Sequence, residues 1–391
     1  MLVRPLPLVV ALLQLLSALS LGVSATPSRE DAAAKVARNG TVIVTAANFG
    51  YLNHVQNFKC FMDRLGLNFL LVALDERAFE GAQRLGVVSV SLTTAGRNAS
   101  RRVRGTDAQR TQQIRSSPQS ALVVEEAAAD YHTHGFHVIT VRKIEAVVRV
   151  LQLGFDVLFI DSDVVLLRDP FPLLGAALAA SKADYIFTSN KLCPAAGGLP
   201  FDFRNPQEEG NTGLFFVRPS PGILALLNAT IAAAPSFPGL DDQSIFWRVA
   251  RAARDVQVVA LPSCASAAAA AAAAASTSPS SLTTALATSS PSSPSSPRAT
   301  VCALDECGFS VGALRGTAFA ALQAELQRRG AEPVSLHANW IKGNAAKAAA
   351  LAARGLWLSQ PGGGGGGGAV CAPLVSPFPP SPPPRPPPPP K

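Results

Sequence analysis

The feature that most constrains the fold is an alternation of short apolar, β-branched runs with segments of helical periodicity. Residues 41–46 (TVIVTA) and 156–160 (DVLFI) are of the first kind, whereas residues 53–65 and 138–153 repeat apolar side chains at helical spacing. Further strands are expected at residues 68–74, 87–92, 184–188, 212–217 and 256–261, and a further helix at 241–253. Buried strands that alternate with helices are typical of an α/β fold with a mostly parallel sheet. Ligands of such sheets bind beyond the carboxyl ends of the strands, so the residues that follow each strand are the ones to inspect for function.

Two low-complexity segments interrupt or end this pattern. Residues 263–300 are almost entirely Ala, Ser, Thr and Pro, and residues 359–391 hold a glycine run followed by proline repeats. Neither has many large apolar side chains to bury, so we expect a disordered insertion and a disordered tail. This leaves one folded domain in two pieces, residues 40–262 and residues 301–358.

Residues 1–25 have the composition of a secretory targeting segment. Arg4 precedes an apolar run that is shorter than the roughly 20 residues of a comfortable membrane span, and small residues follow it at positions 23–25. The segment is therefore either a cleaved signal peptide or a retained N-terminal anchor. Asn-X-Ser/Thr sequons at Asn39, Asn98 and Asn228 agree with entry into the secretory lumen.

The six cysteines would meet an oxidising environment in that lumen, where disulfides persist. Their spacing fits no zinc motif, and six cysteines allow 15 pairings, among which sequence alone cannot choose. Cys264 and Cys302 flank the low-complexity insertion. We expect a disulfide between these two, which would close the insertion off as a loop.

The charge distribution argues against a nucleic-acid-binding protein. The formal net charge is +8, but the basic residues are scattered except for an arginine cluster at residues 97–115 without interleaved aromatic side chains. We interpret that cluster as a solvated loop. His132, His134 and His137 resemble a metal site, but their spacing suits one poorly, and we expect them in a loop. No apolar run beyond residue 25 is long enough to indicate a multi-pass membrane protein.

The chemistry centres on Asp161-Ser162-Asp163, which directly follows the apolar strand expected at 156–160. Carboxylates at i and i+2 on a turning backbone can both face one ion. Two such charges need a counter-charge, and a hard divalent cation with oxygen ligands would supply it. On that basis we expect Asp163→Ala to leave metal-free stability level or slightly higher, because repulsion from Asp161 is relieved. The alternative interpretation is a turn whose aspartates merely cap a strand end.

Six segments together resemble the plant and algal nucleotide-diphospho-sugar transferases of glycosyltransferase family 77. The segments are VIVTAANFGYLNHVQNF, FHVITVRKIEAVVRVLQLGFDVLFIDSDVVLLRDP, ADYIFTSN, NTGLFFVRPS, DDQSIFWRV and LHANWIKG. They follow the family's order over most of residues 41–261 and again over 334–357. The resemblance implies a GT-A-like fold, with residues 40–262 and 301–358 forming a single catalytic domain.

The resemblance also implies roles for individual residues. Asp161, Asp163 and His337 would hold Mn²⁺ or Mg²⁺, and mixed carboxylate and imidazole ligation suits Mn²⁺ better. Asp242 or Gln243 would lie beside the reacting sugar. The donor would be contacted by residues at strand ends and by cationic or amide side chains: Thr45, Ala46, Asn48, Asp75, Lys143, Asn211, Lys342 and Lys347. For the lysines and Asp242, a solvated or helix-capping role is the alternative.

The implied activity is a metal-dependent transfer of a sugar from a nucleoside diphosphate sugar, UDP-linked by expectation, to a cell-wall glycan or hydroxyproline-rich glycoprotein. The family is assigned to retention of anomeric configuration. The implied location is the secretory pathway, as a Golgi-lumenal or secreted protein. A second hypothesis is a non-catalytic wall glycoprotein that carries an inactive transferase-like domain, which the proline-rich tail favours. A third is a transferase of a related GT-A family such as family 8.

Overall fold

The computed structural model describes residues 28–92, 124–193, 201–261, 264, 297–305, 307–360 and 370–378. The expected targeting segment, the arginine cluster at 97–115, the sequon at Asn98, most of the insertion and the end of the tail lie outside these residues. Within the described ranges, no helix combines the length and hydrophobicity needed to cross a bilayer.

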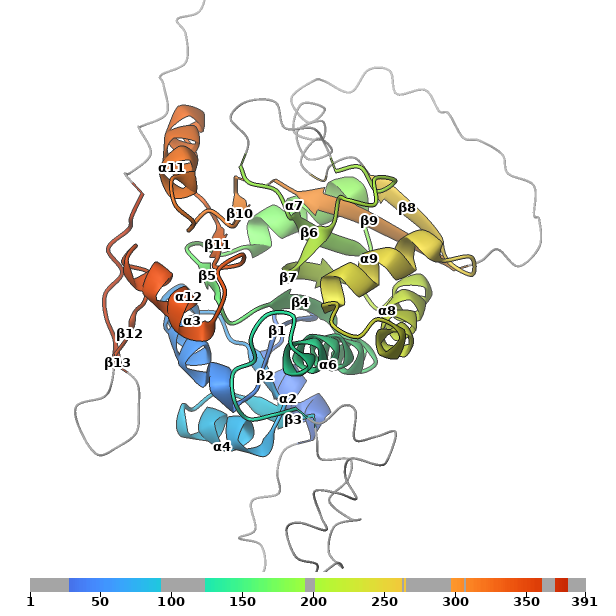
Figure 1. Ribbon diagram of the computed structural model, residues 1–391, viewed down its shortest axis with the longest axis horizontal. Coiled ribbons are helices and arrows are strands. Elements are labelled where there is room, and N and C mark those ends of the chain that lie inside the picture. The colour runs from blue at the N-terminus through green and yellow to red at the C-terminus, as the bar shows by residue number, and fades with distance from the viewer. Residues whose placement is uncertain are drawn as a thin grey trace, which may run out of the picture.

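An eight-stranded sheet forms the centre of the domain, with strand order β3-β2-β1-β4-β7-β6-β9-β8 (Figure 1). Its strands are β1 (Thr41–Ala47), β2 (Leu70–Ala73), β3 (Ser89–Ser91), β4 (Asp156–Ile160), β6 (Tyr185–Ser189), β7 (Gly210–Val217), β8 (Gln257–Leu261) and β9 (Arg298–Leu304). All neighbours pair in parallel except β7, which runs antiparallel to both β4 and β6. The expected α/β fold with a mostly parallel sheet is therefore confirmed.

A second, three-stranded sheet has the order β10-β11-β5. Its strands are β5 (Val164–Leu166), β10 (Phe309–Val311) and β11 (Ser335–His337). β5 starts directly after Asp163, and its antiparallel register with β11 sets Val164 opposite His337. This pairing brings the end of β11 beside the end of β4, although the two are far apart in the sequence.

Helices cover both faces of the large sheet (Figure 1). The core on one face includes α2 (Arg29–Val36), α6 (His134–Leu151), α8 (Pro221–Ala233) and α9 (Asp242–Ala252). The core on the other includes α3 (Leu52–Leu65), α4 (Glu76–Arg84) and α7 (Phe171–Ser181). The remaining helices are α11 (Ala318–Arg329), α12 (Asn344–Ala352) and the 3₁₀ turns η2 (Phe49–Tyr51) and η5 (Ala234–Ser236). The strands that carry the expected site residues are thus held rigidly between two apolar layers.

Helix α6 starts earlier than expected. The Thr133 side chain accepts a hydrogen bond from Phe136 N at 3.2 Å, which caps the helix at its first turn. The loop expected for the three histidines is therefore wrong for His134 and His137, which belong to α6. His132 lies in the preceding turn, and His137 is buried with its Nδ1 2.6 Å from Leu240 O. The His137 ring thus contacts a backbone carbonyl 103 positions away in the sequence rather than sharing a metal with the other two histidines.

All six cysteines form disulfides. The Cys264–Cys302 bond confirms the expected closure of the insertion. Cys193 pairs with Cys307, and Cys371 pairs with Cys60 on α3 across 311 positions of sequence.

The Cys60–Cys371 bond corrects the expectation of a tail that is disordered from residue 359 onward. β12 (Ser359–Gln360) pairs antiparallel with β13 (Val370–Cys371). Phe378 is buried against Phe319 of α11, with ring centroids 5.5 Å apart. A disulfide, a strand pair and a buried aromatic side chain therefore attach residues 370–378 to the domain.

Candidate active site

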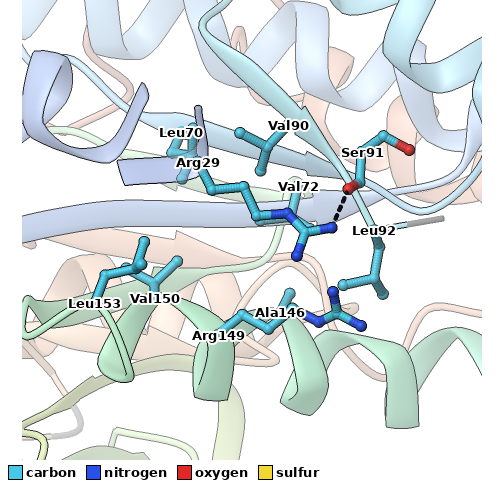
Figure 2. A pocket seen from close by; sticks show the side chains of 10 residues that line it. All are labelled: Arg29, Leu70, Val72, Val90, Ser91, Leu92, Ala146, Arg149, Val150 and Leu153. Carbon is cyan, nitrogen blue, oxygen red and sulfur yellow. Dashed lines mark hydrogen bonds between the residues drawn. The ribbon is translucent and has the colours of Figure 1, made fainter. Parts of the chain in front are cut away.

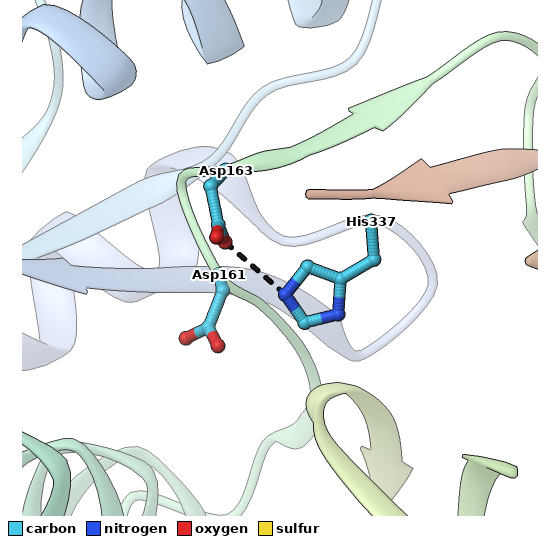
Figure 3. A group of neighbouring side chains, drawn as sticks. All are labelled: Asp161, Asp163 and His337. Atoms are coloured by element: carbon cyan, nitrogen blue, oxygen red, sulfur yellow. Dashed lines mark ion pairs between the residues drawn. The ribbon is translucent and has the colours of Figure 1, made fainter. Parts of the chain in front are cut away.

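Three potential metal ligands converge where β4 and β11 end. Asp161 and Asp163 flank the turn between β4 and β5, and His337 is the last residue of β11 (Figure 3). One ligand atom from each lies within 4.8 Å of the other two. His337 Nε2 is 3.2 Å from Asp163 Oδ1, the contact that Figure 3 draws as a dashed line. The backbone fixes the turn, because Asp161 N donates to Gly213 O at 2.7 Å.

Asn211 orients the His337 ring. Gly213 N can only donate, so the Asn211 atom 2.8 Å from it is the carbonyl oxygen Oδ1. His337 Nδ1 lies 3.1 Å from the same oxygen and must therefore carry the proton of that hydrogen bond. The hydrogen bond at Nδ1 leaves Nε2 facing Asp163. Metal-binding histidines normally have this arrangement, in which one ring nitrogen binds the metal and the other donates to an acceptor.

Gly213 makes room for the His337 ring beside β7. A Cβ atom at this position would overlap His337 Cε1 and lie 2.9 Å from both Asn211 Oδ1 and Asp161 Oδ2. The absence of a side chain at Gly213 thus lets the His337 ring and the Asp161 carboxylate approach β7 closely. Oxygen and nitrogen donors of this kind suit a divalent cation such as Mn²⁺. The residues present therefore fit the metal that the family resemblance implies.

Two lysines neutralise the aspartates from within the chain. Lys347 Nζ of α12 lies 2.6 Å from Asp163 Oδ2, and Lys143 Nζ of α6 lies 3.4 Å from the Asp161 carboxylate. Burial alone would raise the pKa of Asp163, but Lys347 and His337 outweigh it and hold that pKa well below its usual value. The expectation that a cation alone supplies the counter-charge is therefore incomplete, and so is the expectation of level stability for Asp163→Ala.

Asp242 shares Lys143 with Asp161. It lies at the start of α9, where Asp241 caps the helix by accepting from Ser244 N at 2.9 Å. Asp242 is buried, with Oδ2 3.0 Å from Lys143 Nζ. Burial raises the pKa of Asp242 to about 6, and Lys143 limits the rise. Lys143 is likewise buried, so the alternative that it is a solvated surface charge is wrong. Burial alone would lower the pKa of Lys143, but the carboxylates of Asp161 and Asp242 outweigh that effect and raise it.

Hydrogen bonds to two side chains, Glu209 and Asn211, fix the orientation of the Gln243 amide. Its Nε2 donates to Glu209 Oε2 at 3.1 Å, and its Oε1 accepts from Asn211 Nδ2 at 3.3 Å. A carboxylate can only accept, so Glu209 fixes which end of the amide faces Asn211. Sequence reasoning did not identify Glu209, because nothing but its place just before β7 distinguishes it.

These groups open into a cavity of about 410 Å³. Most of the expected site residues line it: Ala46, Lys143, Asp161, Asp163, Asn211, Asp242, Gln243, His337, Lys342 and Lys347. Lining residues that sequence reasoning did not single out include Tyr51, Tyr131, Arg315 and Trp340. Tyr51 ends η2 and the other three lie in turns or bends, and the place of these segments beside the cavity is set by tertiary packing, which local patterns do not reveal.

Three expected donor contacts do not line the cavity, and two of them have structural partners instead. Thr45 is buried within β1. Asn48 Nδ2 donates to Glu125 O and Ala127 O, both at 2.7 Å, and so holds the loop that precedes α6. Asp75 caps α4 by accepting from Ala78 N at 2.8 Å and also accepts from Phe49 N at 2.7 Å.

A second hollow, between α2, α6 and the strands β2 and β3, is too small to compete as a ligand site (Figure 2). Its volume is about 10 Å³, no more than one water molecule requires. Figure 2 shows the Arg29 side chain crossing it, with Nη2 donating to Ser91 O at 3.1 Å.

Most of this domain is similar in sequence to a known protein family. Residues 67–351 match the model of the nucleotide-diphospho-sugar transferase family. A curated relative, beta-arabinofuranosyltransferase RAY1 of Arabidopsis thaliana, is 26% identical over 215 residues, which are 54% of this chain and 33% of the relative. The chain thus spans about a third of the length of this relative.

Two solved glycosyltransferases are similar at a low level. Galactosyltransferase LgtC in complex with donor and acceptor sugar analogs has 9% identity and a TM-score of 0.31, covering 53% of this chain and 68% of its own. The glycosyltransferase GlyE in Streptococcus pneumoniae TIGR4 has 15% identity and a TM-score of 0.27, and the match covers 52% of this chain and 41% of GlyE.

Proposed function

Because this chain belongs to the nucleotide-diphospho-sugar transferase family, we propose that it is a metal-dependent glycosyltransferase that uses a UDP-sugar. The acceptor would be a cell-wall glycan or a hydroxyproline-rich glycoprotein, and the transfer would retain the anomeric configuration. The observation that carries the proposal is the convergence of Asp161, Asp163 and His337 on one wall of a large cavity.

Each group in the cavity has a physical task in this proposal. Asp161, Asp163 and His337 would hold Mn²⁺ or Mg²⁺, which when bound supplies Lewis-acid stabilisation of the leaving diphosphate. Lys347, now paired with Asp163, and Lys342 place positive charge where that diphosphate would lie. Positive charge fixed in advance stabilises a leaving group without further reorganisation.

The nucleotide would occupy the end of the cavity near β1. Ala46 lines that end with a small side chain, and Tyr51 adds an aromatic ring whose hydroxyl donates to Ala129 O at 2.8 Å. The expected base and ribose contacts at Thr45, Asn48 and Asp75 would then act through the backbone that they position rather than by direct contact.

Gln243 and Asp242 would lie beside the reacting sugar. The Glu209 contact holds the Gln243 amide in one orientation, so its carbonyl end faces the Asn211 side of the cavity. The buried Asp242 forms an ion pair with Lys143 and would position this lysine beside Asp161. A fixed polar environment of this kind favours one sugar pose over others.

The compartment would be the lumen of the secretory pathway, with the Golgi as the first candidate. Three disulfides support an oxidising environment. The sequon asparagine Asn39 is exposed in a turn, where a glycan would meet no obstruction. Whether residues 1–25 are cleaved or retained as an anchor is decided by N-terminal sequencing of the mature protein.

The test is UDP release from a panel of UDP-sugars by the purified lumenal part, with Mn²⁺ and with a chelator. The name of the Arabidopsis relative makes UDP-arabinofuranose the first donor to try. Metal-dependent release with one donor supports the proposal. The alternative, a wall glycoprotein with an inactive transferase-like domain, predicts neither UDP release nor calorimetric binding of Mn²⁺ and UDP.

A further inference from the structure

We infer that Trp340 is the platform of an acceptor subsite that binds a neutral saccharide by one face of its ring. The inference rests on the proposed function, since it assigns the second substrate of the same cavity. Trp340 lines that cavity and keeps 38% of its surface exposed, unusually much for so large an apolar side chain.

The backbone holds the Trp340 indole in place by an uncommon conformation. Trp340 has a φ of +60°, in the left-handed region that bulky side chains rarely adopt. Its ring lies against Gly312, where a Cβ atom would overlap Trp340 Cε3 and Cζ3. Gly312 thus packs closely against the six-membered ring of the indole, while part of the side chain stays open to the cavity. Strain of this kind persists where the surrounding structure fixes it, commonly at binding sites.

Strand pairing places Trp340 on the acceptor side of the metal ligands. β1 pairs with β4, which leads through Asp161 and Asp163 into β5. β5 pairs with β11, and β11 pairs with β10, which Gly312 directly follows. Figure 1 shows this order, with β1 and β10 on opposite sides of β5 and β11. A nucleotide at the β1 end and its diphosphate at the metal ligands leave the Trp340 end for the acceptor.

The chemistry around Trp340 suits a saccharide. A pyranose or furanose ring presents C–H groups on a face and hydroxyl groups around its rim, so it needs an apolar plate beside polar atoms. The face of the Trp340 indole would supply this apolar surface. Asn339 and Arg315 line the same cavity and supply polar groups beside the indole, and the buried Asn339 Oδ1 has no hydrogen-bond partner in the described part of the chain.

Intrinsic fluorescence tests this subsite without requiring any turnover. The chain has three tryptophans: Trp247 is fully buried, and Trp357 packs edge-on against His54 outside the cavity lining. The probes are neutral arabino-, galacto- and xylo-oligosaccharides. We expect saturable quenching that Trp340→Phe abolishes and the matched control Trp357→Phe keeps. Quenching that survives Trp340→Phe, or no response to any of the three sugar classes, overturns the inference.

Kinetics then separate the two substrates. We expect Trp340→Ala to raise the acceptor KM by about tenfold or more, as loss of a stacking face implies. UDP affinity and donor hydrolysis in the absence of acceptor should stay within about twofold of wild type. If Trp340→Ala weakens UDP binding as much as saccharide binding, the ring serves the donor and the inference is wrong. If wild-type protein binds no UDP in Mn²⁺, the proposed function fails instead, and the saccharide titration still decides the subsite.

Discussion

Replacing Asp163 with alanine should destabilise the metal-free protein, because its carboxylate is the partner of a half-buried lysine and a buried histidine. Lys347 Nζ lies 2.6 Å from Asp163 Oδ2, and His337 Nε2 lies 3.2 Å from Oδ1. Asp163 is only 7% exposed. Removing one member of a buried ion pair typically destabilises by about 3–5 kcal/mol, since the other charge stays behind without compensation.

The Lys347 side chain keeps 22% of its surface exposed, so it can turn partly toward water. We therefore expect a loss at or just below the lower limit of that range, about 2–3 kcal/mol. For a domain of this size the melting temperature falls by about 2–4 °C per kcal/mol, which gives a decrease of about 4–12 °C.

The assay is thermal unfolding in a chelator for wild type, Asp163→Ala, Lys347→Met and the double variant. The double variant should recover part of the loss, because it no longer leaves an unpaired lysine, and the cycle should yield a coupling of about 1–3 kcal/mol. An Asp163→Ala protein that melts like wild type without metal would refute this reasoning. Additive losses in the double variant would show that Asp163 and Lys347 do not act as a pair.

Three further changes test other parts of the structure. Gly213→Ala should weaken Mn²⁺ binding by at least about tenfold, measured by calorimetry, because the new methyl group overlaps His337. Glu209→Ala should lower kcat while UDP affinity stays level, since it releases the Gln243 amide; an equal loss of UDP affinity would instead indicate general disruption. Truncation after Leu358 should lower the free energy of unfolding by about 2–5 kcal/mol, because it removes a disulfide partner and a buried phenylalanine; an unchanged denaturation midpoint would contradict the attachment of residues 370–378.

Local sequence pattern was enough to predict most strands of the large sheet and the strand end that carries Asp161 and Asp163. It did not predict β9, whose first three residues lie in the segment expected to be a disordered insertion. The apolar run of β4 marks a buried strand, and Asp161 and Asp163 follow its end, where an α/β sheet presents its ligands. His337 was identified through the surrounding LHANWIKG segment, and the short β11 strand explains how it reaches the aspartates. The Cys264–Cys302 bond could be expected because the two cysteines flank one low-complexity segment.

Contacts between distant segments could not be predicted in this way. The partner of Asp163 is Lys347, which is 184 positions away, so the pattern of residues around either position does not indicate that the two meet. The same holds for the Cys60–Cys371 bond, which ties a segment that composition alone describes as unstructured. Asp75 shows the opposite case: a residue at a strand end that resembled a ligand contact is the cap of α4, since the same carboxylate suits both roles.

The central claim is that Asp161, Asp163 and His337 hold a divalent cation that a UDP-sugar requires. The most direct measurement is the calorimetric affinity for UDP, with Mn²⁺ and with a chelator, for wild type and His337→Ala. We predict that Mn²⁺ tightens UDP binding of wild type by at least about tenfold and that His337→Ala loses this gain. Equal UDP affinity with Mn²⁺ and with the chelator in the wild-type protein would contradict the account.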